Sequence, residues 1–264
     1  MENKPKAVIS LFDLSGEAIK PWFEDGYQCF CFDAQHPEGI NFHREIGPKT
    51  YPESWFYGNV VRANSVYTVG GQAISPMGEM DDMSWSSIIE RLFNLYDVQI
   101  VMGWPPCTDL ATSGARWMSE KKKANPRFQK EAMELVYFVR DIGISYKCPW
   151  FFENPVSMIS SYYKRPDYTF SPHEYGLYLP EDDVSPDADG IIPPRDQYTK
   201  KTCIWSGNGF VMPEKKPVEL PDGYTYSPQY KRLGGRSQKT KNIRSKTPRG
   251  FARAVWMANR SYEG

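Results

Sequence analysis

Residues 7–33 decide the fold, and they divide into AVISLF (Ala7 to Phe12), DLSG (Asp13 to Gly16), a helical stretch (Glu17 to Asp25), YQCFCF (Tyr27 to Phe32) and Asp33. The first run is continuously apolar and predicts a buried parallel strand. The stretch before Gly26 predicts a short helix, and the second apolar run predicts another strand. A strand, a turn, a helix and a strand that closes on an acidic residue open a doubly wound nucleotide-binding fold. We therefore expect an α/β protein with a Rossmann-like, mostly parallel sheet.

The rest of the chain continues this alternation of strands and helices. Short apolar runs predict further strands at Val66 to Val69, Val98 to Met102 (VQIVM), Pro149 to Phe152 (PWFF) and Thr202 to Trp205. Apolar residues at helical spacing predict helices over Trp85 to Leu95, Pro126 to Ile144 and Pro248 to Asn259. Residues 162–198 are predicted to form loops, and residues 206–243 an irregular basic stretch.

Composition limits the class of protein. Apolar residues make up 40% and charged residues 24% of the 264 residues, which fits a single globular domain with a small appendage. The formal net charge is zero, so the overall charge does not require a polyanionic partner. Five cysteines without Cys-x-x-Cys spacing and three scattered histidines indicate neither a disulfide framework nor a metal site. The N-terminus resembles neither a signal peptide nor a membrane span, and we expect a cytoplasmic protein without a membrane partner.

The charge is unevenly placed along the chain. Between Gly223 and Tyr262 there is no Asp or Glu. The basic residues of this stretch are Lys231, Arg232, Arg236, Lys239, Lys241, Arg244, Lys246, Arg249, Arg253 and Arg260. A local basic stretch in a neutral chain is a candidate contact for a polyanion such as nucleic acid. A solvated surface is the alternative interpretation, and the sequence leaves both open.

Two polar sites follow predicted strands. Pro105-Pro106-Cys107 follows the strand VQIVM, and Glu153-Asn154 follows the strand PWFF. Ligands of open α/β sheets bind at the carboxyl ends of strands. Two prolines fix the backbone that presents Cys107, which makes its thiol a candidate nucleophile. Glu153 is a candidate acid or hydrogen-bond partner for a heterocycle. The simpler interpretations are a small buried residue for Cys107 and a loop carboxylate for Glu153.

A third candidate site lies at the first predicted turn. Gly16 allows the backbone to turn tightly beside a ligand. Asp33 ends the next strand, where an acidic side chain can accept hydrogen bonds from a pair of ribose hydroxyls. This pair of features indicates a ligand that contains a nucleoside.

The order and spacing of these motifs resemble the DNA cytosine-C5 methyltransferases over nearly the whole chain. Residues 12–16 (FDLSG) resemble the family's Phe-x-Gly-x-Gly motif, with Leu14 at the first Gly. Pro106-Cys107 matches the Pro-Cys motif that carries the nucleophile, and Glu153-Asn154 matches Glu-Asn-Val, with Pro155 in place of Val. Residues 197–202 (QYTKKT) resemble Gln-x-Arg-x-Arg, with Thr199 and Lys201 at the two Arg positions. Residues 245–255 (SKTPRGFARAV) resemble the last motif, which closes over the cofactor.

The resemblance implies a sheet of the S-adenosylmethionine-dependent methyltransferase type, with S-adenosylmethionine as the cofactor and no metal. The implied catalytic residues are Cys107, Glu153, Asn154 and Lys201. The implied cofactor-binding residues are Phe12, Asp13, Leu14, Ser15, Gly16, Asp33, Ala34, Pro106, Lys246 and Thr247. The implied nucleic-acid contacts are Arg116, Lys200, Arg232, Arg236, Lys239 and Lys241. For Arg116 an ordinary surface charge is the alternative interpretation.

The implied activity is transfer of a methyl group to C5 of cytosine in DNA, through a covalent Cys107 adduct with a base flipped out of the duplex. Residues 1–205 and 245–264 would form the catalytic domain. Residues 206–244 would form a small basic insertion that contacts the target, as in compact phage and prophage enzymes. Such a small insertion predicts short or loose sequence specificity. The alternatives are the same chemistry on single-stranded DNA, on RNA or with another one-carbon donor, an inactive DNA-binding relative, and a restriction or defence partner that docks on DNA.

Overall fold

The computed structural model describes residues 4–36, 85–186, 190–234 and 237–261, together with short strands at residues 40–43, 60–63, 73–75 and 78–80. The strands are β1 (Lys6–Leu11), β2 (Gln28–Phe32), β3 (Ile40–His43), β4 (Val60–Ala63), β5 (Ala73–Ser75), β6 (Gly78–Met80), β7 (Asp97–Gly103), β8 (Trp150–Pro155), β9 (Tyr168–Phe170) and β10 (Thr202–Gly207). The α-helices are α1 (Lys20–Glu24), α2 (Trp85–Leu95), α3 (Met118–Ala124), α4 (Phe128–Ser145), α5 (Ile159–Tyr162), α6 (Pro228–Arg232), α7 (Gln238–Ser245) and α8 (Arg249–Asn259). The 3₁₀ helices are η1 (Cys107–Asp109), η2 (Thr112–Trp117), η3 (Pro172–Tyr178) and η4 (Pro194–Asp196).

One mixed sheet organises the molecule, with the strand order β3-β4-β2-β1-β7-β8-β10-β9. The neighbours β4-β2-β1-β7-β8 are parallel, whereas β3, β10 and β9 each pair antiparallel with their neighbours. The chain places β2 and β4 on one side of β1 and then places β7 and β8 on the other side. This reversal makes a topological switch point between β1 and β7. The expected α/β class and mostly parallel sheet are confirmed, and the order is compatible with a Rossmann-like fold.

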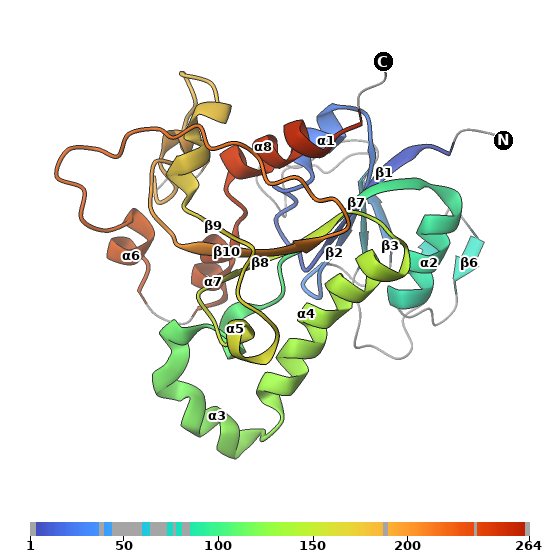
Figure 1. Cartoon of the computed structure of the whole chain (residues 1–264), viewed down its shortest axis with the longest axis horizontal. Coiled ribbons are helices and arrows are strands. Elements are labelled where there is room, and N and C mark those ends of the chain that lie inside the picture. Colours follow the sequence, from blue (N-terminus) through green and yellow to red (C-terminus); the bar gives the residue numbers. More distant parts are fainter. Residues whose placement is uncertain are drawn as a thin grey trace.

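Helices cover both faces of this sheet (Figure 1). The side chains of Ala7, Ile9 and Leu11 pack into one apolar cluster with α2 and α4. The side chain of Val8 points to the other face and packs into a second cluster with α1 and α8. Successive side chains of a strand point to opposite faces, so a strand covered on both sides must be apolar throughout. This burial explains the continuous apolar run of β1.

Most predicted elements are confirmed, and the differences have local causes. The first helix begins at Lys20 rather than at Glu17, because the Ile19 amide closes a turn on the Gly16 carbonyl. Strand β8 continues to Pro155, because β10 pairs with its last residues. The predicted loop at residues 162–198 contains β9 and η3, and the basic stretch contains α6 and α7. The predicted strand at 66–69 lies outside the described residues.

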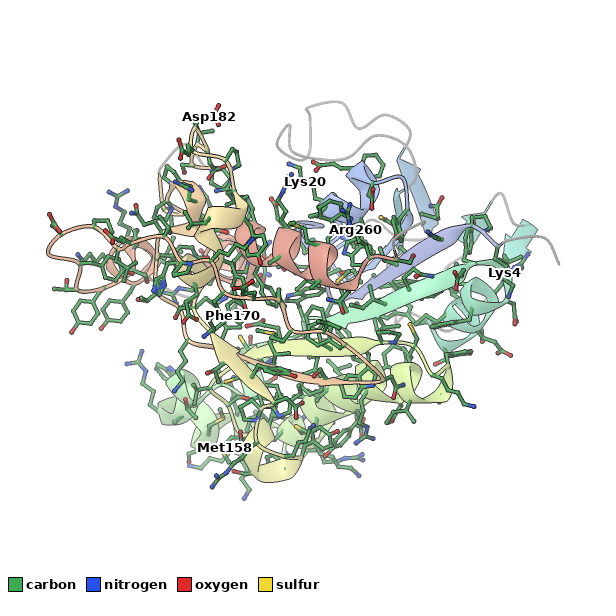
Figure 2. All side chains as sticks on the ribbon, turned by 45° about the horizontal axis from the view of Figure 1, so that its top comes forward. Lys4, Lys20, Met158, Phe170, Asp182 and Arg260 are labelled. Carbon is green, nitrogen blue, oxygen red and sulfur yellow. The ribbon has the colours of Figure 1, made fainter. Side chains whose placement is uncertain are left out.

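The side chains on the two sides of the sheet are seen together in Figure 2, where Lys20 and Arg260 lie on the α1 and α8 side and Met158 on the opposite side. Gly103, at the end of β7, allows α4 to pack closely, since a Cβ there would come within 2.5 Å of a Val139 methyl group. The end of β7 is therefore fixed against the α4 layer. Within the described ranges, no helix has the length and apolar character needed to span a membrane.

Candidate active site

The loop that presents Cys107 leaves the sheet at the switch point. The Trp104 amide donates to the Leu11 carbonyl at 2.9 Å, which holds the loop beside the end of β1. Pro106 is exposed and extended, with φ −52° and ψ 121°, and η1 begins at the half-buried Cys107. Because proline fixes φ, this backbone is restrained before the thiol is reached. Cys107 therefore lies where the fold class places ligands.

The nucleophile loop is joined to the segment that follows β8. Ala111 forms an isolated bridge with Ser157, and the Met158 amide donates to the Leu110 carbonyl at 2.9 Å. The Lys121 ammonium of α3 donates to the Asp109 carboxylate and to the Thr108 carbonyl, both at 2.7 Å. These contacts hold the residues after Cys107 in one arrangement.

Glu153 and Asn154 lie in β8 beside this loop. The Asn154 side chain is completely buried, and its amide group donates to the Pro105 carbonyl at 2.9 Å. Its carbonyl oxygen and the Glu153 oxygen Oε1 are buried without a hydrogen-bond partner among the described residues. Buried polar atoms without partners are rare in folded proteins, because their lost hydration is not replaced. Glu153 and Asn154 are consecutive in β8, so their side chains point to opposite faces of the sheet. The unpartnered Glu153 oxygen is suited to a ligand with polar hydrogens.

The electrostatics of Cys107 and Glu153 are coupled. Burial raises the pKa of the Cys107 thiol, and the neighbouring Glu153 raises it further, whereas Lys200 lowers it. Burial also raises the pKa of Glu153, again opposed by Lys200. A raised pKa favours the protonated form, which makes Glu153 a candidate proton donor. The pKa values of both Cys107 and Glu153 therefore depend on the charge of Lys200.

The antiparallel direction of β10 brings Lys200 to this edge of the sheet. Thr202 pairs with Pro155, so the residues just before β10 lie next to the end of β8. Lys200 is half-buried and donates to the Arg244 carbonyl at 2.8 Å. Lys201 is exposed, and its charge acts on Cys203 instead. The lysine beside the Cys107–Glu153 pair is thus Lys200, which the sequence placed among the nucleic-acid contacts, rather than Lys201.

The turn after β1 is built by Asp13. Its carboxylate accepts hydrogen bonds from the Gly16 amide at 2.7 Å, the Ser10 hydroxyl at 2.8 Å and the Ser15 hydroxyl at 3.1 Å. Phe12 and Gly16 adopt left-handed backbone angles, with φ 59° and 71°. The Asp13 side chain is 3% exposed. Asp13 and Ser15 therefore shape the predicted cofactor turn through their contacts with each other and with the backbone.

The remaining predicted cofactor residues surround this turn. Asp33 follows β2, is half-buried, and accepts the Gln35 amide at 2.8 Å. The Leu14 carbonyl is 3.3 Å from the His36 Nε2, and Ala34 is exposed. The end of β2 therefore lies against the turn, with a carboxylate at the surface of the sheet edge.

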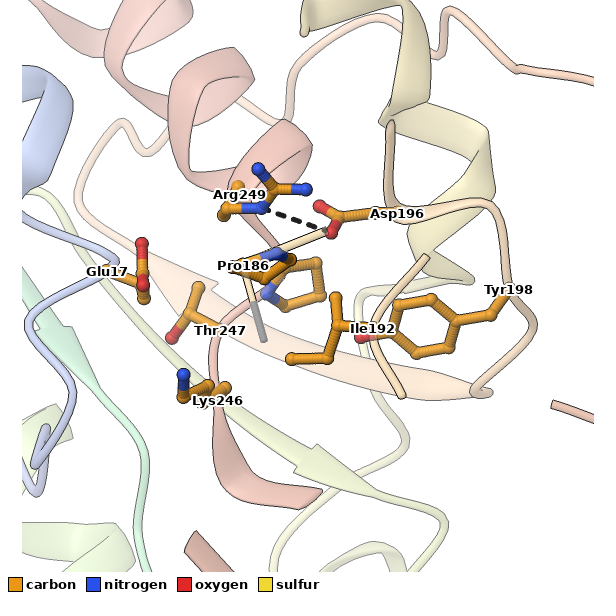
Figure 3. A pocket seen from close by; sticks show the side chains of 9 residues that line it. Glu17, Pro186, Ile192, Asp196, Tyr198, Lys246, Thr247 and Arg249 are labelled. Atoms are coloured by element: carbon orange, nitrogen blue, oxygen red, sulfur yellow. Dashed lines mark ion pairs between the residues drawn. The ribbon is translucent and has the colours of Figure 1, made fainter. Parts of the chain in front are cut away.

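Lys246 and Thr247 line a small pocket that sequence reasoning did not anticipate (Figure 3). Glu17 and Lys246 lie on one side of it, and Tyr198 lies on the other. Arg249 also lines the pocket and is 3.7 Å from the buried Asp196, which accepts the Gly250 amide at 2.8 Å.

Arg249 and the acidic residues Glu17 and Asp196 of this pocket come from distant parts of the chain, as does Asp183, which pairs with Arg249. Asp183 accepts two hydrogen bonds from Arg249, at 2.7 and 2.8 Å. Burial raises the pKa of Asp196 to about 6, although Arg249 opposes the shift. Glu17 is 8% exposed, and its pKa is also raised by burial. No sequence signal connects these residues, because the ion pairs join the start of α8 to residues more than fifty positions earlier in the chain.

The predicted nucleic-acid contacts are mostly at the surface. Arg116 is exposed, and its guanidinium lies 5.0 Å from the ring centre of Trp117. Arg232 is exposed on α6, and Lys239 and Lys241 are exposed on α7. Arg236 lies outside the described residues. The exposed positions are accessible to a polyanion, as the prediction requires.

Among the residues that the structure describes, no group of three or more His, Cys, Asp or Glu side chains could hold a metal ion. Comparison with protein-family models and with curated proteins finds no match to this chain. The site itself is therefore the basis for assigning a function.

Proposed function

We propose that this protein transfers a methyl group from S-adenosylmethionine to C5 of cytosine in DNA, with Cys107 as the nucleophile. The observation that carries the proposal is the buried, unpartnered oxygen of Glu153, held in the strand beside the Cys107 loop. The resemblance of the ordered motifs to the cytosine-C5 methyltransferases supports it. A carboxyl without a partner costs stability, and such a cost is expected where a ligand completes the hydrogen bond.

The residues present can account for the bond changes at the base. Cys107 loses its proton to solvent and forms an S–C6 bond, while N3 of cytosine takes the proton that Glu153 holds. Carbon C5 thereby gains the character of an enamine carbon and becomes nucleophilic. After methylation, C5 loses its proton to solvent, the S–C6 bond breaks, and Glu153 recovers the N3 proton. The raised pKa of Glu153 favours the protonated carboxyl that the first step needs.

Lys200 and Asn154 would position and tune these groups. The positive charge of Lys200 lowers the pKa of Cys107 and so favours the thiolate. Asn154 holds the Pro105 carbonyl and thereby fixes the loop that carries Cys107. Neither role requires contact with the reacting carbon.

The switch point carries groups that fit S-adenosylmethionine. Asp33 presents a carboxylate at the end of β2, the position from which a ribose diol is bound in doubly wound folds. Gly16 and Phe12 bend the backbone away from the strand end with left-handed angles, which leaves the turn compact. When bound, S-adenosylmethionine supplies an electrophilic methyl group. Leu14, Ala34 and Pro106 would contribute surface to this site, and Lys246 and Thr247 would approach it from the start of α8.

Trapping of the covalent adduct tests the proposal. DNA that contains 5-fluorocytosine cannot lose the C5 substituent, so a protein–DNA adduct should accumulate in the presence of S-adenosylmethionine. Cys107→Ala should abolish the adduct, whereas Cys203→Ala, a change of the buried cysteine opposite Asn154, should retain it. Denaturing gel electrophoresis measures both. A folded wild-type protein that forms no adduct with duplex DNA, single-stranded DNA or RNA would favour a binding protein over an enzyme.

A further inference from the structure

Two exposed tyrosines stand together in the basic part of the chain. Tyr226 is 58% and Tyr230 71% exposed. Their ring centres are 5.0 Å apart with an interplanar angle of 29°, a stacked arrangement. We call this pair the tyrosine platform. One face of each ring is occupied by the other ring, and the outer faces remain available for a further planar group.

The backbone under the platform is held in place. The Ser227 hydroxyl accepts the Tyr230 amide at 3.2 Å and so caps α6, whose first residue is Pro228. Gln229 points inward, is 6% exposed, and hydrogen-bonds the buried Tyr198. Because the inward residue of α6 is anchored, the tyrosines on either side of it are directed outward. Their exposure is therefore a consequence of packing.

The segment that carries the platform is attached to the candidate active site. Three consecutive residues just before β10 form hydrogen bonds with residues 224–244. The side chain of Tyr198 bonds to Gln229, the Thr199 amide donates to the Tyr224 hydroxyl at 2.9 Å, and the Lys200 ammonium donates to the Arg244 carbonyl at 2.8 Å. Lys200 is also the residue whose charge acts on Cys107 and Glu153. Residues 198–200 therefore contact both the segment that carries the tyrosine platform and the surroundings of Cys107 and Glu153.

The charge around the platform selects the class of partner. Lys231 is exposed on α6 next to Tyr230, Lys239 and Lys241 are exposed on α7, the next helix along the chain, and residues 223–262 contain no acidic residue. A polyanion satisfies this charge, whereas a neutral apolar partner does not. In an intact duplex the faces of the bases are already stacked on each other. An aromatic platform within a basic surface is therefore suited to a strand whose bases are unpaired.

We propose that the tyrosine platform stacks an unpaired base of single-stranded DNA, while Lys231 and the exposed lysines of α7 bind the phosphates. The proposal deepens the proposed function and rests on it for its biological purpose, which would be to hold the strand next to the target cytosine. Stacking itself needs neither Cys107 nor a cytosine. The platform can therefore be tested with a DNA strand that the enzyme cannot methylate.

The test is binding of fluorescein-labelled oligothymidylate to the full-length protein, followed by fluorescence anisotropy at fixed salt. Tyr226→Leu/Tyr230→Leu keeps apolar bulk but removes the rings, and should weaken binding about tenfold. Tyr226→Phe/Tyr230→Phe is the matched control, and should stay within about twofold of wild type because stacking survives. Binding of the corresponding adenine–thymine duplex should change by less than about twofold in either variant.

Three outcomes would overturn the proposal. The leucine variant could bind oligothymidylate as tightly as wild type, or it could lose affinity for strand and duplex equally. Oligouridylate of the same length is measured in parallel, and a loss of affinity for it alone would assign the platform to RNA. Circular dichroism of each variant establishes that it is folded, and the single substitution Tyr230→Leu repeats the test at the more exposed ring. Because thymine forms no adduct, failure of the adduct experiment leaves this result interpretable, and failure here leaves the adduct result unaffected.

Discussion

Asp13 and Glu153 are both acidic residues at strand ends next to the switch point, and their environments differ. The Asp13 carboxylate accepts hydrogen bonds from the Gly16 amide and the Ser15 hydroxyl of its own turn and from the Ser10 hydroxyl of β1. The Glu153 oxygen Oε1 is buried with no such partner among the described residues. Both carboxylate oxygens of Asp13 thus accept hydrogen bonds, whereas Oε1 of Glu153 accepts none from the described residues.

This difference separates a group that builds the structure from a group suited to chemistry. A carboxylate held by local donors stabilises the turn that it belongs to. A buried carboxyl with an unpartnered oxygen opposes folding, and its pKa rises because the charged form is poorly solvated. The same substitution, acid to amide, should therefore have opposite consequences at the two positions.

The largest effect is expected for Glu153→Gln. The glutamine cannot donate a proton to N3, so single-turnover methylation should slow by about a thousandfold. The free energy of unfolding should stay the same or increase. Because the folded-state pKa of Glu153 is raised, its ionisation destabilises the fold as pH rises above the unfolded-state value. Urea denaturation should therefore show that the variant gains more free energy of unfolding, relative to wild type, at pH 8 than at pH 5. The size of the gain should be ordinary for a point mutant. A variant that methylates at the wild-type rate would remove Glu153 from the mechanism.

An intermediate effect is expected for Asp13→Asn. The amide nitrogen of asparagine cannot accept the hydrogen bonds that the second carboxylate oxygen accepts, so the free energy of unfolding should fall by about 1–3 kcal/mol. Asp33→Asn is the matched control on the next strand end, where the half-buried carboxylate accepts the Gln35 amide. It should cost less stability and instead weaken S-adenosylmethionine binding, measured by calorimetry. The comparison fails if Asp33→Asn destabilises the protein more than Asp13→Asn.

The smallest effect is expected for Lys200→Met. Removal of the positive charge should raise the pKa of both Cys107 and Glu153, because Lys200 lowers both in the wild type. The pH profile of adduct formation should therefore move to higher pH, with several-fold slower reaction at neutral pH. Lys201→Met is the control, since Lys201 is exposed and acts on Cys203 instead. Equal shifts in the two variants would mean that Lys200 has no special relation to Cys107.

Much of the fold followed from local patterns. The buried run of β1, the amphipathic α4 and the final α8 lie within a few residues of their predicted bounds. Helix α3 and the short α6 and α7 were not predicted, because their polar sequences carry no apolar stripe and their turns depend on contacts with other segments. In α7 the Ser237 hydroxyl caps the helix, and Thr240 is its one buried residue.

The sequence by itself determined that Cys107 and Glu153 lie at one edge of one sheet, because parallel strands end on the same side whatever the details of packing. It also determined the strand–turn–helix–strand opening and the basic character of residues 223–262. Only the tertiary structure decided which lysine lies beside Cys107 and Glu153. It also decided that the Asp13 carboxylate accepts hydrogen bonds within the protein, and that Tyr226 and Tyr230 face outward together. These outcomes depend on the register of β10 against β8 and on which buried groups anchor each loop. Such contacts join residues distant in the chain, so no local pattern encodes them.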